Sequence, residues 1–176
     1  RVHAESDIIE RWAEQANDST DPIRLERVFS AQWHPPAGTA YRFSHLYGRW
    51  NDEFHLVRET LTPGVKVIES RRLTTSHHHN PWFALDGGDA SETQGEVWFG
   101  ALGWSGNWKL CAEDTGFCTT RLSLGVNDFD FAWDLQPGET FTTPPAYAGY
   151  TQNGFGAASR SLHHLIRSRL IPHPRA

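Results

Sequence analysis

The chain has 176 residues and a net charge of -5 at pH 7, a length that suits one domain and falls short of the roughly 250 residues of a typical (β/α)8 barrel. The pI is near 6.0, and the sequence has no run of Lys and Arg that could form a basic patch. Neither nucleic acid nor an anionic membrane is therefore expected as a partner. No apolar stretch approaches the ~20 residues of a transmembrane helix, and we expect a soluble, cytoplasmic protein.

Along the chain, short runs rich in Val, Ile, Thr and aromatic residues are broken by Gly, Pro, Asn and Asp, a pattern typical of β-strands. The first two runs, 5–16 and 23–33, flank a polar turn at 17–22, which predicts a half-buried hairpin. Further strands are expected over 41–49, 54–61, 65–72, 82–85, 95–102, 108–112, 118–124, 129–135 and 140–150. With no helices between them, these strands indicate an all-β fold, an antiparallel β-sandwich.

Two cysteines, Cys111 and Cys118, flank a segment that predicts a tight hairpin turn. A symmetric turn places them opposite each other, where a cross-strand disulfide would contribute roughly 2–3 kcal/mol. Because such disulfides are geometrically demanding, we favour two reduced thiols.

After Gly154, apolar residues recur at helical spacing until Pro172 and Pro174, which predicts one amphipathic C-terminal helix over 154–171. The apolar face of this helix comprises Phe155, Ala158, Leu162, Leu165, Ile166 and Leu170. We expect a sandwich over 1–153 with this helix belonging to the same domain.

Three consecutive histidines, His77, His78 and His79, invite a reading as a metal or catalytic site. In an extended segment successive side chains point to opposite faces, so at most His77 and His79 share one face. Pro81 biases Asn80 towards the same extended conformation. We favour a structural or interdomain role for His77, His79 and Asn80, with metal binding and proton transfer as the alternatives.

Three aspartates, Asp128, Asp130 and Asp134, would share one face of a single strand, where a calcium ion or a carboxylate pair is conceivable. A turn at Asn127 and Asp128 followed by an exposed strand face is favoured, because calcium loops usually need glycine-punctuated oxygen ligands.

Two of the eight tryptophans lie at expected turn boundaries. Trp82 follows Pro81, and Trp104 precedes the turn at 105–107. Exposed aromatic side chains at such places mark contacts with sugars or with neighbouring domains. Both residues are therefore candidates for a substrate-proximal or interdomain surface.

A set of motifs stands in one order between about Arg11 and Pro172: RLER (24–27), HLYGRW (45–50), ESRRLTTSHHHNPWF (69–83), SGNW (105–108), LGVNDFDF (124–131), LQPGE (135–139) and LHHLI (162–166). As a set, the motifs resemble the later part of the N-terminal β-sandwich, or supersandwich, domain of bacterial α-galactosidases of glycoside hydrolase family 36.

The resemblance implies a parent enzyme that hydrolyses terminal α-galactosides of the raffinose and melibiose type with retention of configuration. The family places two catalytic aspartates in a TIM barrel and often forms tetramers through this domain. Its nucleophile lies in a K-W-D motif, whereas Trp133 and Asp134 belong to a segment that matches the sandwich's own F-x-W-x-L-x-P-G strand. The family's W-E-A-T-Y-F entry into the barrel is not found.

We therefore expect a chain without catalytic residues, metal or cofactor, inactive alone, that supports the barrel of the same enzyme and assembles homo-oligomers. The catalytic barrel is expected to be missing from the chain, and the sequence has no Met, so we expect a processed, trimmed or excised product. The alternatives are a stand-alone carbohydrate-binding module that uses Trp82 or Trp104 and a metal-dependent hydrolase built on the histidines.

Overall fold

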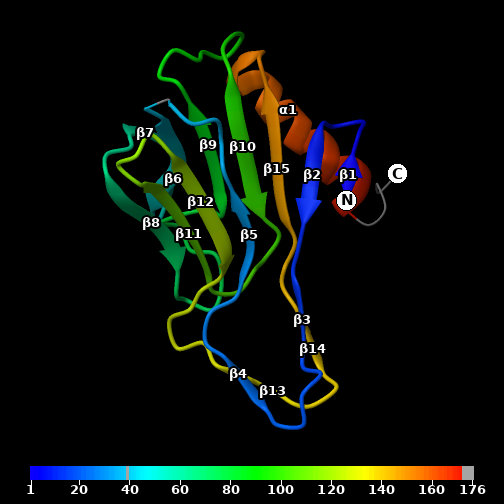
Figure 1. The fold of residues 1–176 in the computed structure, drawn as a ribbon. Helices are drawn as coiled ribbons and strands as arrows, with labels where there is room; N and C mark the ends of the chain where they lie inside the picture. Colours follow the sequence, from blue (N-terminus) through cyan, green and yellow to red (C-terminus); the bar gives the residue numbers. More distant parts are fainter. Residues whose placement is uncertain (39, 172–176) are drawn as a thin grey trace.

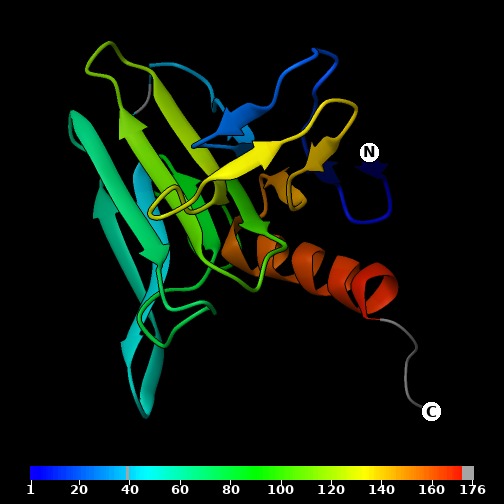
Figure 2. The same cartoon turned by 90° about the horizontal axis from the view of Figure 1, so that it is seen from below.

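The computed structural model describes residues 1–38 and 40–171, and these form two facing β-sheets, a projecting arm and one helix (Figures 1 and 2). The larger sheet has seven strands in the order β1-β2-β15-β10-β9-β6-β7, each pair antiparallel. Its strands are β1 (Val2–His3), β2 (Ile8–Arg11), β15 (Ala146–Thr151), β10 (Val97–Leu102), β9 (Trp82–Asp86), β6 (Arg42–Arg49) and β7 (Asp52–Thr60).

The second layer consists of a three-stranded sheet and one adjoining strand. In this sheet β12 (Thr120–Val126) pairs with β11 (Trp108–Asp114) and with β5 (Phe29–Trp33). The strand β8 (Gly64–Ser70) lies beside β11 (Figure 1). The predicted all-β antiparallel sandwich is confirmed.

The main core lies between these layers and follows from the two-residue alternation of the strands. On β11, Trp108, Leu110 and Ala112 point inwards and are fully buried. They belong to one apolar cluster with Phe43 of β6 and Phe83 of β9. Burial of each large side chain stabilises the fold by roughly 1.5–3 kcal/mol.

The helix α1 (Gly154–Leu165) packs against β2, β10 and β15 of the larger sheet and buries a second core. Gly154 allows the helix to begin there, because it has φ of 73° and an added Cβ would lie 2.3 Å from the carbonyl oxygen of Ser91. The predicted C-terminal helix is thus present, with four of its six predicted apolar residues buried: Phe155, Ala158, Leu162 and Leu165.

The last part of the predicted helix differs from expectation. Residues Ile166–Leu170 form a π-helix, η1, whose wider turn rotates its side chains off the apolar face of α1. Ile166 and Leu170, which the helical spacing places on the apolar face, are 39% and 42% exposed. Pro172 and Pro174, predicted to stop the helix, lie outside the described residues.

Two short ribbons form an arm that projects beyond the sandwich (Figure 1). One pairs β3 (Glu14–Ala16) with β14 (Thr140–Thr142), and the other pairs β4 (Ile23–Leu25) with β13 (Trp133–Leu135). The predicted hairpin between 5–16 and 23–33 is therefore wrong. Its turn is bound to a distant segment instead, since the side-chain amide of the buried Asn17 donates to the carbonyls of Asp21 and Leu135, both at 2.9 Å.

The hairpin of β11 and β12 has a different register from the predicted one. Asp114 pairs with Thr120 and Cys111 with Ser123, so the two cysteines do not lie opposite each other. The turn is shifted because Thr115 closes it by donating its backbone N–H to the Thr119 carbonyl at 3.1 Å. Both thiols are free, and Cys118 is exposed.

Candidate functional site

The candidate residues fall on two separate surfaces. The first, which we call the histidine surface, comprises Tyr47 of β6 and His77, His78 and His79 of the loop between β8 and β9. The second, which we call the aromatic hollow, lies between the sandwich and the arm and contains Trp104. The structure therefore does not bring all the predicted site residues together.

The histidine segment is a loop rather than a strand. His79 forms an isolated bridge to Tyr47, and the Gly48 amide donates to the carbonyl of His78 at 3.0 Å. The ring centroids of His77 and His78 lie 4.4 Å apart. The expectation that consecutive histidines point to opposite faces is wrong here, because the loop bends and the alternation holds only for extended backbone.

His79 is fixed against β6. Its Nδ1 lies 3.2 Å from the carbonyl oxygen of Leu46, which can only accept, so Nδ1 carries the proton. Its ring centroid lies 5.5 Å from that of the buried His45, whose Nε2 is 3.2 Å from Glu59 Oε1. Burial acts to raise the pKa of Glu59, but Lys66, at 2.7 Å, and His45 lower it overall. These contacts describe a packed histidine that holds the loop on the sheet.

Burial, which penalises the charged form, lowers the pKa of His79 from its usual value, and repulsion from His45, His78 and Lys66 adds to this against the opposing hydrogen bond to Leu46. The unfolded chain takes up this proton near pH 6.5 and the folded chain only at lower pH. The contribution of neutral His79 to the free energy of unfolding is therefore complete above pH 6.5, and it is lost as the pH falls through the pKa of the folded state. An NMR titration of the His79 ring protons measures the midpoint.

The control substitution for this titration is His164→Gln, on the exposed face of α1. On acidification the parent chain should lose free energy of unfolding as His79 becomes protonated. This part of the loss should be absent in His79→Gln and should remain in His164→Gln. A midpoint for His79 at or above 6.5 would contradict the packing argument.

Asn80 and Trp82 continue the same surface. The Asn80 carbonyl accepts from the Trp82 amide at 2.7 Å, which closes the bend at Pro81. Trp82 is half-buried and packs against the core under α1. It lines a groove of about 510 Å³ between the sheet and the helix, together with Leu102, Phe155 and others. Trp82 is thus a wall of a groove rather than a free platform.

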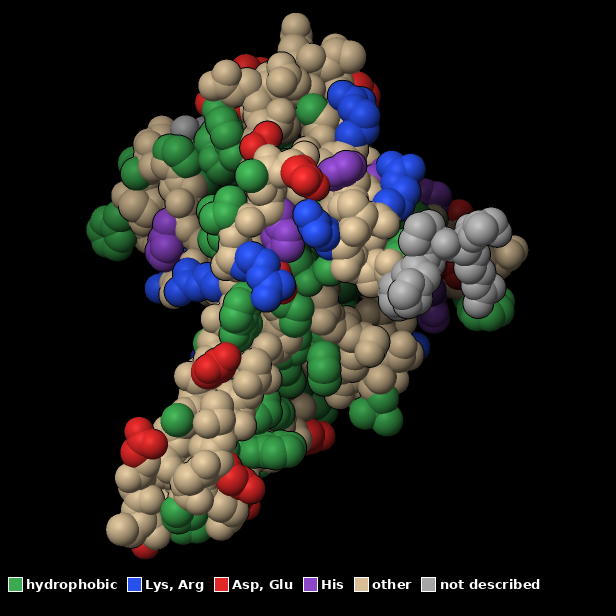
Figure 3. Space-filling view, turned by 90° about the vertical axis from the view of Figure 1, so that its right-hand side faces the viewer, with side chains coloured by type: hydrophobic (Ala, Val, Ile, Leu, Met, Phe, Trp, Pro, Cys, Tyr) green, Lys and Arg blue, Asp and Glu red, His purple; other side chains and the backbone are tan. Residues whose placement is uncertain are grey.

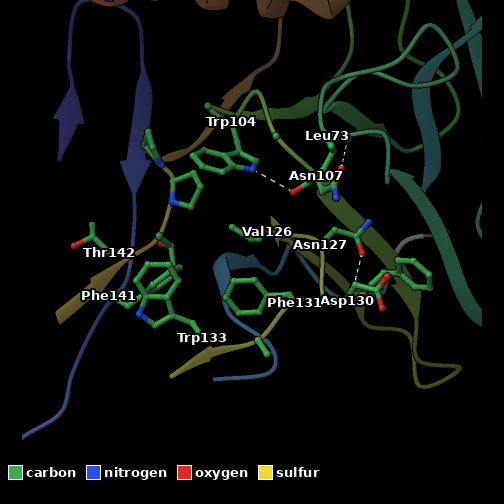
Figure 4. A pocket seen from close by; sticks show the side chains of 17 residues that line it. Leu73, Trp104, Asn107, Val126, Asn127, Asp130, Phe131, Trp133, Phe141 and Thr142 are labelled. Carbon is green, nitrogen blue, oxygen red and sulfur yellow. Dashed lines mark hydrogen bonds between the residues drawn. The ribbon is translucent and has the colours of Figure 1, made fainter. Parts of the chain in front are cut away.

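The aromatic hollow has a volume of about 680 Å³ (Figure 4). Its walls come from the turn between β10 and β11, the segment from β12 to β13, and the segment from β14 to β15. The side chains with large apolar surfaces in it are Trp104, Phe129, Phe131, Trp133 and Phe141. Trp104 is 43% exposed and its indole N–H donates to the Asn107 carbonyl at 3.2 Å.

The three aspartates do not share a strand face, because β13 begins only at Trp133. Asp128 is bound by Arg27, at 2.7 Å, and by Lys109. Burial acts to raise the pKa of Asp128, but these two cations lower it overall. Asp130 lies in the loop and lines the hollow, and Asp134 is exposed, 3.6 Å from Arg24. Their predicted common face is wrong.

The favoured turn at Asn127 and Asp128 is present. Asn127 is buried, and its side-chain oxygen accepts from the Phe129 amide at 2.9 Å. Its side-chain amide donates to the carbonyls of Ser70 and Trp108, which ties the floor of the hollow to β8 and β11. Among residues 1–38 and 40–171, no three His, Cys, Asp or Glu side chains are grouped so that they could hold a metal ion.

Sequence reasoning found Trp104 but missed its neighbours in the hollow. Phe131 and Trp133 were assigned to a strand, and Phe141 was not singled out. No local signal would have separated them from a strand, because Phe129, Phe131 and Trp133 alternate as they would on one strand face. In the part of the chain described here, no helix is long and apolar enough to cross a membrane.

The fold defines an antiparallel β-sandwich domain with an arm and a covering C-terminal helix. Comparison with known sequences places it further: a model of the Glycosyl hydrolase family 36 N-terminal domain matches residues 1–136. The chain belongs to this family. It is 39% identical over 163 residues to α-galactosidase AgaA of Geobacillus stearothermophilus, covering 93% of this chain and 22% of the relative.

Solved structures agree with this assignment. α-Galactosidase AgaB of Geobacillus stearothermophilus matches with a TM-score of 0.92 and 38% identity, over 96% of this chain and 23% of that chain. A variant of AgaA in complex with raffinose matches with a TM-score of 0.91 and 38% identity, over 94% of this chain and 23% of that chain. The chain thus spans less than a quarter of the length of these relatives.

Proposed function

We propose that this domain is the non-catalytic N-terminal part of an α-galactosidase, in which it supports a catalytic barrel and takes part in subunit assembly. The observation that carries the proposal is the extent of the match, which takes in 93% of this chain but only 22% of AgaA. The parent enzyme would hydrolyse terminal α-galactosides of the raffinose type, since an AgaA variant was solved in complex with raffinose.

The histidine surface is the proposed contact with the barrel. Tyr47 is 46% exposed although it stacks on His78, with ring planes 16° apart. Leu56 on the neighbouring strand β7 is also 46% exposed, and it lines the groove that contains Trp82. Aromatic and apolar side chains held in a fixed arrangement but open to solvent are typical of a surface that another domain covers.

Apolar side chains also run from the body of the molecule onto the arm, as Figure 3 shows for one face. On the arm, Ile23 and Trp133 are 43% and 48% exposed. A two-stranded ribbon has no core of its own in which to bury them. We assign the arm to contact with a second subunit.

The test uses the purified chain and the intact gene product. The chain alone should not hydrolyse an aryl α-galactoside, because the proposed catalytic aspartates belong to the barrel. Hydrolysis that scales with the concentration of the chain and survives repurification would contradict the proposal. The intact gene product should have a much larger mass and carry the activity.

Within the intact gene product, Tyr47→Ala tests the proposed barrel contact. It should make the connection between the domains several-fold easier to cleave by limited proteolysis, because the contact loses its central ring. The matched control is Trp50→Ala in the turn that follows β6, where the side chain is 81% exposed. Equal cleavage rates for the two variants would show that the histidine surface is not part of the contact with the barrel.

A further inference from the structure

The histidine surface continues into the molecule as a row of rings in contact. The ring centroids of His77 and His78 lie 4.4 Å apart, and the ring of Tyr47 stacks on His78 at 6.1 Å. Tyr47 also contacts His79 at 5.2 Å, and His79 contacts the buried His45 at 5.5 Å. Four imidazole rings, the type of side chain whose charge changes near neutral pH, are therefore joined through one phenol ring.

The groups around this row offer no free anion to a protonated His77 or His78. The charged and titratable groups beside the row are Arg72 on the same loop, His45, Tyr47 and Arg49 on β6, Asp52, His55 and Glu59 on β7, and Lys66 on β8. The carboxylate of Asp52 binds Arg49 and His55. That of Glu59 binds Lys66 and His45. In the part of the chain that the structure describes, neither His77 nor His78 pairs with a carboxylate.

Protonation of these rings is penalised, and a covering domain would increase the penalty. Burial lowers the pKa of His78 from its ordinary value, and repulsion from His77 and Arg72 adds to this. All three histidines of the loop keep part of their surface open to solvent, so a domain that covers them removes the water that a charge would need. The stack on Tyr47 favours an imidazolium, but it exists whether or not a domain is docked and so does not oppose this effect.

We propose that the contact between the histidine surface and the barrel is a pH-sensitive switch, which holds while His77 and His78 are neutral and loosens when they are protonated. This inference rests on the proposed function, because it takes the barrel as the covering domain. Docking releases the protons that the open histidines carry, so its strength is constant above pH 6.5 and falls as the pH drops through the pKa of His78 in the open state. For each proton released, docking weakens by up to about tenfold per pH unit below that pKa.

Limited proteolysis of the intact gene product at about pH 7.5 and about pH 5.5 tests the inference. The rate of cleavage between the domains is divided by that of an unstructured reporter peptide in the same reaction, which removes the pH dependence of the protease itself. The parent should be cleaved about tenfold faster at the lower pH. The double variant His77→Gln/His78→Gln should have nearly the same relative rate at both pH values, because glutamine stays neutral. The control His164→Gln, on the exposed face of α1, should respond to pH like the parent.

The inference is overturned by a parent with the same relative rate at both pH values. It is also overturned by a double variant that keeps the response of the parent, because the pH dependence would then arise elsewhere in the fold. An NMR titration of the isolated chain gives a second readout, in which a midpoint for the His78 ring at or above 6.5 would contradict the switch.

Tyr47→Ala at neutral pH separates this inference from the proposed function. If Tyr47→Ala loosens the connection between the domains but acidification of the parent does not, the barrel contact stands and only the switch fails. If neither change has an effect, the barrel contact and the switch both fail.

Discussion

Replacing Asp86 with alanine is expected to lower the free energy of unfolding by about 3–4 kcal/mol. Asp86 is wholly buried at the end of β9, and its two oxygens accept from Nε and a terminal nitrogen of Arg42 at 3.0 and 2.8 Å. It also accepts from the amides of Gly88 and Ala90. The substitution removes the carboxylate that accepts from the Arg42 guanidinium and from the backbone N–H groups of Gly88 and Ala90. Urea unfolding of the parent and variant chains measures the loss.

The neighbouring Asp89→Ala serves as the control, since Asp89 is exposed in the same turn. It should change stability by no more than about 0.5 kcal/mol. Asp86→Asn should lie between the two, because the amide keeps one oxygen for the backbone donors but loses the charge. A loss below about 1 kcal/mol for Asp86→Ala would show that Arg42, which keeps 24% of its side chain exposed, is rehydrated at little cost.

The second large effect is expected at Trp108, the largest fully buried side chain. Trp108→Ala should cost about 3–5 kcal/mol, because it opens a cavity between the two layers. The indole nitrogen of Trp108 has no hydrogen-bond partner within the described residues. Trp108→Phe should therefore be much milder, since it removes the unpaired N–H along with part of the ring.

The same unfolding measurement checks both substitutions, with Trp50→Ala, an exposed tryptophan, as the control. A Trp108→Phe variant as unstable as Trp108→Ala would contradict this expectation, because the smaller cavity would then cost as much as the larger one. Because both substitutions remove the unpaired N–H, the difference between them measures the cost of the additional cavity.

The strands and the sandwich were predictable because they depend on alternation, which each strand carries in its own sequence. On β11, Trp108, Leu110 and Ala112 alternate with half-buried residues, and the structure buries the same three. The helix was predictable as far as Leu165 for the same reason, at a different period. Its last turns were not, because nothing local distinguishes an α-turn from a π-turn at Ile166.

The pairing of strands was less predictable. The run 23–33 looked like the partner of 5–16, but its first part pairs with Trp133–Leu135 of β13, more than a hundred residues away. The choice depends on Asn17, whose side chain reaches the Leu135 carbonyl. The hairpin register at Cys111 likewise depends on hydrogen bonds between Thr115 and Thr119. Such contacts leave no periodic signal.

The sequence by itself determined the fold class, the terminal helix and the family, because alternation, helical spacing and ordered motifs are properties of the chain as written. Only the tertiary structure decided where the candidate residues lie. Trp82 and Trp104 occupy similar places beside their turns in the sequence, yet Trp82 is a half-buried wall of the groove under α1, whereas Trp104 is 43% exposed in the aromatic hollow. The physical reason is that exposure depends on neighbours such as Phe155 and Phe141, which are distant in sequence and meet these tryptophans only after folding.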